Sequence, residues 1–159
     1  MSGLRPVLHP RHALRLAMVL ACSLLAPAQA AEPVRFAALD IWLEAPAPVA
    51  AWQFELRDGS AAMQVVGVEG GDSAAYPDAP YYDRDAVAAG VADRIVVADY
   101  SLEPASRLPR GRTRVATVHV MLPAAAEPDF QLILVTATTH DGRPLDAALG
   151  FAVRQGSAP

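Results

Sequence analysis

Hydrophobic and polar residues alternate along most of the chain after Pro33. A period of two predicts half-buried β-strands, because successive side chains of a strand point to opposite faces. The clearest case is residues 50–57, in which Ala, Trp, Phe and Leu alternate with Ala, Gln, Glu and Arg. Similar patterns cover residues 36–44, 63–69, 94–100, 114–122, 130–138 and 148–154. Since no long helical pattern interrupts them, the sequence predicts an all-β fold, an antiparallel β-sandwich of about seven to nine strands.

One long segment, residues 70–93, does not alternate. We expect Asp83 to cap a short helical turn through residues 86–88, which Gly90 ends. Irregular segments of this length in a compact domain are usually functional or mobile, so we expect the binding residues to lie in this segment. The segment contains three tyrosines and five aspartates, namely Tyr76, Tyr81, Tyr82, Asp72, Asp78, Asp83, Asp85 and Asp93.

The first thirty residues have the pattern of a secretory signal peptide. Three arginines at 5, 11 and 15 precede an apolar stretch over residues 16–25, and Ala-Gln-Ala at 28–30 matches a cleavage site. The apolar stretch is shorter than the roughly 20 residues of a membrane span, so no transmembrane segment is predicted. We expect residues 1–30 to be removed and residues 31–159 to form one domain with a frayed tail at 155–159, exported to the periplasm or the extracellular medium.

Cys22, the one cysteine of the chain, leaves a second route of export open. The residues Val-Leu-Ala at 19–21 loosely resemble the lipobox that precedes the acylated cysteine of bacterial lipoproteins. The apolar stretch continues beyond Cys22, however, so plain cleavage after Ala30 is the favoured interpretation. In that case the exported chain has no cysteine with which to form a disulfide.

The charge of the chain argues against nucleic acid as a partner. The sequence has 13 basic residues, all arginine, against 17 Asp and Glu, and a net charge of −4. Removal of residues 1–30 takes away three arginines and no acids, which leaves 10 against 17, or −7. Nucleic-acid binding needs clustered positive charge, whereas an acidic domain repels anionic surfaces and attracts cations.

No catalytic motif is present in the sequence. It contains no G-x-S-x-G nucleophile motif, and its only cysteine lies in the predicted signal peptide. His119 is expected at the surface of a strand and His140 in a turn, and two isolated histidines do not make a zinc site. The prediction is therefore a protein that is not an enzyme.

The candidate binding residues are aromatic, acidic and basic. Tyrosine rings stack on sugar faces and also anchor protein interfaces, while the alternative for such a cluster is to cover one end of the core. Carboxylates close in sequence suggest a calcium site, with turn capping as the alternative, and no other cofactor is predicted. The binding candidates are Tyr76, Tyr81, Tyr82, Asp83, Arg110 and Arg112, and the calcium candidates are Asp78, Asp83 and Asp85.

The order of the segments resembles that of cohesin-like modules. Residues 51–56 read Ala-Trp-Gln-Phe-Glu-Leu and residues 65–71 read Val-Val-Gly-Val-Glu-Gly-Gly, and the strands at 94–98 and 115–120 fit the same pattern. The resemblance implies a jelly-roll β-sandwich related to carbohydrate-binding modules. The tyrosine-rich insert between Gly71 and Arg94 departs from the short connection expected there, and no partner-binding motif transfers residue by residue.

These observations favour an exported, non-catalytic binding module that recognises a protein partner or a glycan through residues 70–93. The alternative is a structural or assembly protein of the cell envelope. A glycoside-active enzyme is the third interpretation, and it requires two carboxylates that face each other across a cleft.

Overall fold

The computed structural model describes residues 32–90 and 93–155, which belong to one compact unit, Glu32–Pro159. The predicted signal peptide at 1–30, with Cys22, lies outside the described residues, as do residues 156–159 of the predicted tail. Export and lipoprotein processing therefore stay predictions. Within the described ranges, no helix has both the length and the apolar character that crossing a membrane requires.

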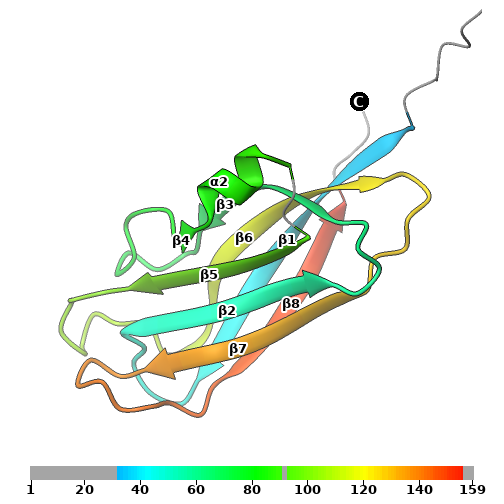
Figure 1. Cartoon of the computed structure of the whole chain (residues 1–159). Helices are drawn as coiled ribbons and strands as arrows, with labels where there is room; N and C mark the ends of the chain where they lie inside the picture. The colour runs from blue at the N-terminus through cyan, green and yellow to red at the C-terminus, as the bar shows by residue number, and fades with distance from the viewer. Residues whose placement is uncertain (1–31, 91–92, 156–159) are drawn as a thin grey trace, which may run out of the picture. The chain divides into compact units, whose positions relative to one another are not determined.

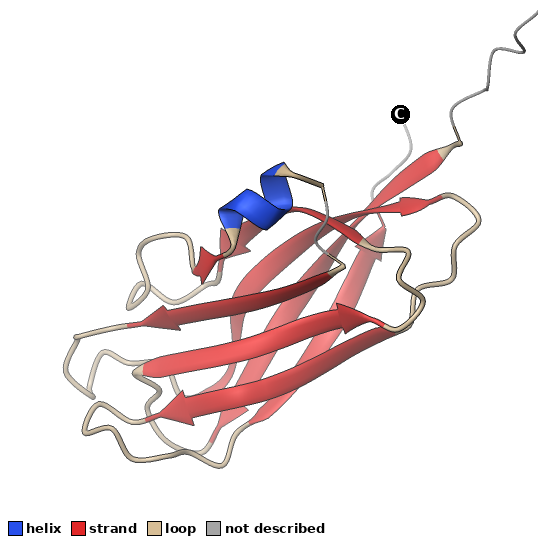
Figure 2. Ribbon diagram, viewed as in Figure 1, coloured by secondary structure: helices blue, strands red, loops and turns tan. Residues whose placement is uncertain are grey.

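Strands make up most of the described structure (Figure 2). Each of the seven predicted strand patterns corresponds to one observed strand, and β4 is the additional one, so the predicted all-β fold is confirmed. The elements are β1 (Val34–Ala45), β2 (Ala51–Asp58), β3 (Gln64–Gly70), β4 (Tyr81–Tyr82), α2 (Arg84–Ala88), β5 (Arg94–Tyr100), β6 (Gly111–Pro123), β7 (Phe130–Thr138) and β8 (Ala148–Gln155).

The strands form two antiparallel four-stranded sheets, in the orders β3-β6-β1-β8 and β4-β5-β2-β7 (Figure 1). In the first sheet Leu39 of β1 pairs with Val118 of β6, and in the second Phe54 of β2 pairs with Val97 of β5. Because alternate residues of a strand lie on the same side, each sheet has one buried face and one outer face. The outer faces are where a ligand can bind.

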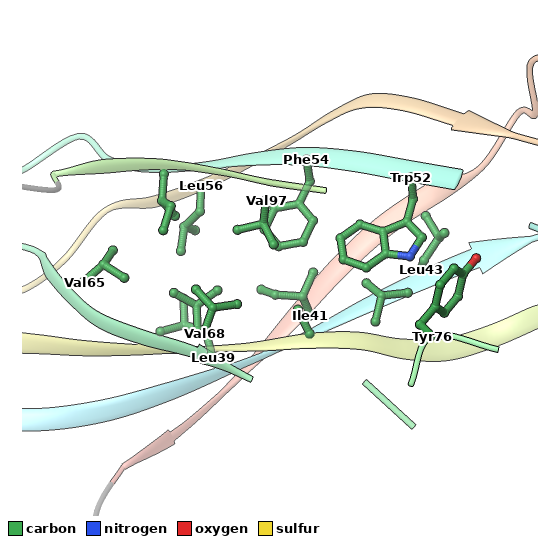
Figure 3. Packing of buried hydrophobic residues seen from close by; sticks show 14 of the residues in the cluster. Leu39, Ile41, Leu43, Trp52, Phe54, Leu56, Val65, Val68, Tyr76 and Val97 are labelled. Carbon is green, nitrogen blue, oxygen red and sulfur yellow. The ribbon is translucent and has the colours of Figure 1, made fainter. Parts of the chain in front are cut away.

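Apolar side chains from both sheets form one buried cluster (Figure 3). Ile41 of β1 lies opposite Phe54 of β2, and both side chains are fully buried. The rings of Trp52 and Phe54 stack nearly parallel, with centroids 5.7 Å apart. Burial of this apolar surface, at about 25 cal/mol per Å², fixes which residues of each strand turn inward and which remain on the outer faces.

The short helix forms where the sequence predicts a capped turn. The Asp83 carboxylate accepts a hydrogen bond of 2.8 Å from the backbone N–H of Ala86, as an N-cap residue does. Gly90 follows the helix with φ of +67°, a left-handed conformation that glycine adopts without strain. The predicted helical turn is confirmed, and it fixes the chain between β4 and β5.

Candidate functional site

The irregular segment 70–93 begins with a close contact to β6. A Cβ atom on Gly71 would overlap the Arg114 carbonyl oxygen and lie 2.7 Å from Val115 Cα, so only glycine fits at this point. The backbone N–H of Asp72 donates to the same carbonyl over 2.9 Å, and the Asp72 carboxylate pairs with the Arg114 guanidinium. The start of the segment is thus fixed against the first sheet.

Tyr76 anchors the middle of the segment in the core. Its ring is buried and meets the Trp52 ring edge to face, with centroids 6.1 Å apart (Figure 3). Its hydroxyl donates a 2.7 Å hydrogen bond to the Val49 carbonyl. Burial, together with the charge of Asp99, raises the pKa of Tyr76. Of the predicted binding residues, Tyr76 is therefore the one that the structure places away from the surface.

Tyr81 and Tyr100 lie together on the outer face of the second sheet, and we call this pair the tyrosine platform. Their rings are nearly parallel, with an interplanar angle of 11° and centroids 6.0 Å apart. Tyr81 is 64 % exposed and Tyr100 is 54 % exposed. Tyr81 pairs with Ala98 and Tyr100 pairs with Ala51, so small neighbours leave both rings uncovered. Hydrogen bonding to Tyr100 raises the pKa of Tyr81.

Two hollows adjoin the tyrosine platform, one on each side of Tyr81. The first, of about 410 Å³, extends over the outer face of the sheet and includes Gln53, Asp83 and Arg94 in its lining. The second, of about 390 Å³, lies toward the end of β5 and includes Asp99 and Glu103. Hydrogen-bonding groups therefore flank an exposed aromatic surface on both sides.

Asp99 lines the second hollow in an unfavourable electrostatic setting. Burial and the charge of the neighbouring Asp78 raise the pKa of Asp99, although its carboxylate accepts a 2.7 Å hydrogen bond from the backbone N–H of Tyr100. Carboxyl groups with a raised pKa occur at functional sites, and they also occur in surface clusters of like charges.

Tyr82 and Asp83 take up structural contacts beside the platform. The guanidinium carbon of Arg84 lies 5.3 Å from the centre of the Tyr82 ring, which is a cation–π arrangement. Tyr82 is partly buried and packs against the core cluster. Asp83 uses its carboxylate to cap α2, so one of its oxygens is already occupied by the helix.

The remaining predicted residues are not brought together with the platform. Arg112 belongs to β6 in the other sheet, where its guanidinium carbon lies 4.9 Å from the centre of the Trp42 ring. Arg110 is exposed immediately before β6. No group of three or more His, Cys, Asp or Glu residues that could hold a metal ion occurs within the described ranges, so Asp78, Asp83 and Asp85 do not converge there.

Two residues of this surface escaped the sequence analysis. Tyr100 ends a strand and gave no sign of a binding role, because its proximity to Tyr81 depends on the pairing register of β4 with β5. Asp99, next to it, shows its unusual environment only once Asp78 is placed nearby by the fold. Cross-strand register between β4 and β5 is the signal that would have identified both residues.

The chain matches no protein-family model, no curated protein and no solved structure. The geometry of the described residues is therefore the basis on which a function is proposed.

Proposed function

We propose that the protein is an exported, non-catalytic binding module that recognises a glycan through the tyrosine platform and the two hollows beside it. The observation that supports the proposal best is the near-parallel stacking of Tyr81 and Tyr100, each more than half exposed. Exposed aromatic rings are suited to binding, since each ring buries a large area on contact and its hydroxyl can still form hydrogen bonds.

A glycan fits the mixture of groups on this surface. The face of a pyranose ring that presents C–H bonds is apolar and packs against aromatic rings, whereas its hydroxyl groups need hydrogen-bond partners. Gln53 and Arg94 supply such partners on one side of Tyr81, and Glu103 supplies an acceptor on the other. The alternation of aromatic and polar groups favours a glycan over a purely apolar protein contact.

Screening of the purified protein on a glycan array, followed by calorimetric titration of each glycan that binds, tests the proposal. We expect Tyr81→Ala and Tyr100→Ala each to weaken binding at least about tenfold, as for aromatic residues at the centre of an interface. Phe36→Ala is the matched control, because Phe36 is 57 % exposed but lies on the other sheet, and it should leave the affinity unchanged.

Three outcomes overturn the glycan assignment. Absence of binding to every glycan tested is the first, and glycan binding that survives both tyrosine substitutions is the second. The third is retention of the protein on beads bearing a partner protein but on no polysaccharide, with loss of that retention in Tyr81→Ala. That result would assign the same surface to protein recognition or to assembly of the cell envelope.

Two carboxylates in the same hollow favour a second candidate, hydrolysis of the bound glycan. Asp78 and Asp99 both line the hollow near the end of β5, and burial raises the pKa of Asp99. A carboxyl group with a raised pKa beside a second carboxylate is the combination that glycosidases use for acid and base. Release of reducing ends by the protein, abolished by Asp99→Asn, would replace the non-catalytic proposal with this one.

We also propose that the fold is a jelly-roll β-sandwich and that the chain is exported. The two antiparallel sheets, with one apolar cluster drawn from both, support a β-sandwich of the jelly-roll type. The cohesin-like resemblance of residues 51–56, 65–71, 94–98 and 115–120 is an additional argument. Export rests on the signal pattern of residues 1–30. N-terminal sequencing of the protein recovered from a bacterial periplasm tests it, and an N-terminus other than residue 31 would refute cleavage after Ala30.

A further inference from the structure

The outer face of the other sheet contains a third hollow, of about 580 Å³, which we call the His119 hollow. Tyr82 lines both this hollow and the first hollow beside Tyr81. Its floor is made by three residues that pair across adjacent strands. Ala38 of β1 and Gly67 of β3 both pair with His119 of β6. Because the residues on either side of His119 have little or no side chain, the sheet surface is hollowed at this point. A Cβ atom on Gly67 would have nothing within 4 Å.

The walls of the His119 hollow are apolar and aromatic. Phe36, 57 % exposed, rises from β1, and Tyr82 contributes from β4. Val66, 42 % exposed, lies at a register shift between Val65 and Gly67, where an extra residue in β3 directs its side chain outward. The hollow falls within the volume range of small-molecule sites, which is roughly 300–1,000 Å³.

Arg154, at one end of the hollow, is already neutralised. Its Nε lies 2.7 Å from Asp40 Oδ2 and its Nη2 donates a 2.9 Å hydrogen bond to Asp40 Oδ1, which is a two-point contact. The hydrogen bond with Arg154 holds the pKa of Asp40 below its usual value. Because Asp40 occupies the guanidinium in this way, Arg154 attracts an anionic ligand only weakly.

Glu69, on the opposite side, is not neutralised in this way. Its side chain is 68 % exposed, and within the described part of the chain it forms no ion pair with an arginine. Its Oε1 lies 3.1 Å from Nε2 of His119, yet this nitrogen has no hydrogen-bond partner among the described residues. Glu69 also lies near enough to Arg154 to help raise the pKa of its guanidinium. Because Asp40 already pairs with Arg154, two carboxylates face one guanidinium, and the hollow combines an aromatic wall with an excess of negative charge.

We propose that the His119 hollow binds a small amphipathic amine, whose apolar body lies against Phe36 and Val66 and whose ammonium group pairs with Glu69. Charge complementarity supports this class of ligand, because the excess of carboxylate over guanidinium at the hollow attracts a cation and repels an anion. The face of the exposed Phe36 ring adds cation–π attraction, typically 0.5–1 kcal/mol at exposed sites, roughly a two- to fivefold gain in affinity. The acidity of the whole chain, with 17 acids against 13 arginines, acts in the same direction.

Three probes with the same apolar body separate the effect of charge from that of shape. These are phenethylamine, which is a cation at neutral pH, phenylacetate, which is an anion, and 2-phenylethanol, which is uncharged. In NMR titrations of the purified protein, we expect phenethylamine to bind at least about tenfold more tightly than either of the others, with shifts at the His119 and Gly67 amides. Equal affinities, or tighter binding of phenylacetate, would overturn the proposal.

Two variants locate the site. Glu69→Gln keeps the shape of an exposed side chain and removes its charge, and it should bring the affinity for phenethylamine down to that for 2-phenylethanol. Gly67→Val fills the floor of the hollow and should abolish binding of both. Gly150→Val is the matched control, because Gly150 is also a strand glycine of this sheet with nothing within 4 Å of its Cβ position, but it does not line the hollow.

The variants can refute either the role of the Glu69 carboxylate or the location of the site. Unchanged phenethylamine affinity in Glu69→Gln refutes the role of the carboxylate, and this exposed substitution does not endanger the fold. Loss of binding in Gly150→Val as well as in Gly67→Val refutes the location. Phe36→Ala should weaken phenethylamine binding, whereas Tyr81→Ala should not, since Tyr81 does not line this hollow.

Discussion

The tyrosine platform and the His119 hollow lie on the outer faces of different sheets and are built in different ways. Tyr81 belongs to β4, a two-residue strand at the sheet edge that forms part of a long irregular segment. The floor of the hollow comes from β6 and β1, strands of 13 and 12 residues that pair with each other in the interior of their sheet, and from the edge strand β3, which pairs with β6. Interior strands hold side chains more firmly than an edge strand does.

This difference separates an adaptable site from a preorganised one. A ligand at the platform contacts a segment held at Gly71, at Tyr76 and by the two-residue strand β4, with no long run of strand pairing on either side of Tyr81. A ligand in the hollow meets groups already fixed by strand pairing. We expect the platform to accept a range of related ligands and the hollow to discriminate by charge and size.

The largest predicted effect on stability contrasts two glycines that lie close in sequence, one beside the platform segment and one in the hollow. Gly71→Ala places a methyl group against the Arg114 carbonyl and the β6 backbone, so it should destabilise the protein by about 3 kcal/mol, as overpacking against backbone does. Gly67→Ala meets open space, and because alanine is favoured over glycine in a strand, it should be neutral or stabilise by up to about 1 kcal/mol. Urea unfolding of both variants measures the two effects.

The outcome for Gly71 also tests how the platform is held. If Gly71→Ala unfolds with the same midpoint as the unaltered protein, the segment is not fixed against β6 and can shift freely. The platform would then be a mobile element instead of an anchored one.

The next largest effect concerns the polar network beside the His119 hollow. Asp40 accepts a 2.8 Å hydrogen bond from the buried Thr117 hydroxyl and two contacts from Arg154. Asp40→Ala leaves the buried Thr117 hydroxyl without this acceptor, whereas the exposed Arg154 guanidinium turns to water. We expect a loss of about 2 kcal/mol in the free energy of unfolding. Glu103→Ala, which breaks a surface pair with Arg107, is the control and should change it by less than about 0.5 kcal/mol.

Equal losses in the two variants would show that the Asp40 network is as weak as an ordinary surface ion pair. The hollow would then lack the rigid polar border that distinguishes it from the platform. Chemical denaturation at two salt concentrations separates the cases, since salt screens the exposed Glu103–Arg107 pair strongly but the hydrogen bond of the buried Thr117 hydroxyl to Asp40 only weakly.

The strands could be predicted from the sequence because their alternation is a local property of each segment. The cap at Asp83 could be predicted for the same reason, since its hydrogen bond reaches only three residues along the chain. The burial of Tyr76 could not, because it depends on the Val49 carbonyl and the Trp52 ring, which only the fold brings near. The sequence pattern showed a tyrosine-rich segment but not which tyrosine turns inward.

The His119 hollow illustrates the same limit more strongly. Ala38, Gly67 and His119 each look unremarkable in the sequence, and the expectation for His119 was an ordinary surface histidine. The hollow arises from the register that aligns the three across β1, β6 and β3. Register between distant strands depends on the packing of the whole core, so no single segment predicts it.

A smaller effect tests the anchor of the platform. Tyr76→Phe removes the hydroxyl that donates to the Val49 carbonyl and leaves that carbonyl buried without its partner. We expect the free energy of unfolding to fall by about 1 kcal/mol, and glycan affinity at the platform to fall modestly, because the segment is held less firmly. Phenethylamine binding in the hollow should not change, and a change there would mean that the two sites are coupled.

The smallest expected effect contrasts two aspartates with opposite pKa shifts. The pKa of Asp40 lies below 3.8 because of its hydrogen bond with Arg154, so the stability it contributes is present above that pH and is lost as the pH falls through its folded-state pKa. Burial raises the pKa of Asp99 above 3.8, so its ionised form opposes folding as the pH rises through that value. Asp99→Asn should therefore stabilise the protein at pH 7, by less than about 1 kcal/mol because the site is partly screened, and should have little effect at pH 3.

Urea unfolding at the two pH values checks this contrast. Asp40→Asn is the opposite case, because that variant should destabilise the protein at pH 7 and do so less at pH 3. Asparagine at 99 still accepts the hydrogen bond from the Tyr100 backbone N–H, so the comparison isolates the charge. If Asp99→Asn destabilises the protein equally at both pH values, the Asp99 carboxylate is not strained. The acidic hollow beside the platform would then be an ordinary solvated surface, and hydrolysis would lose the observation that favours it.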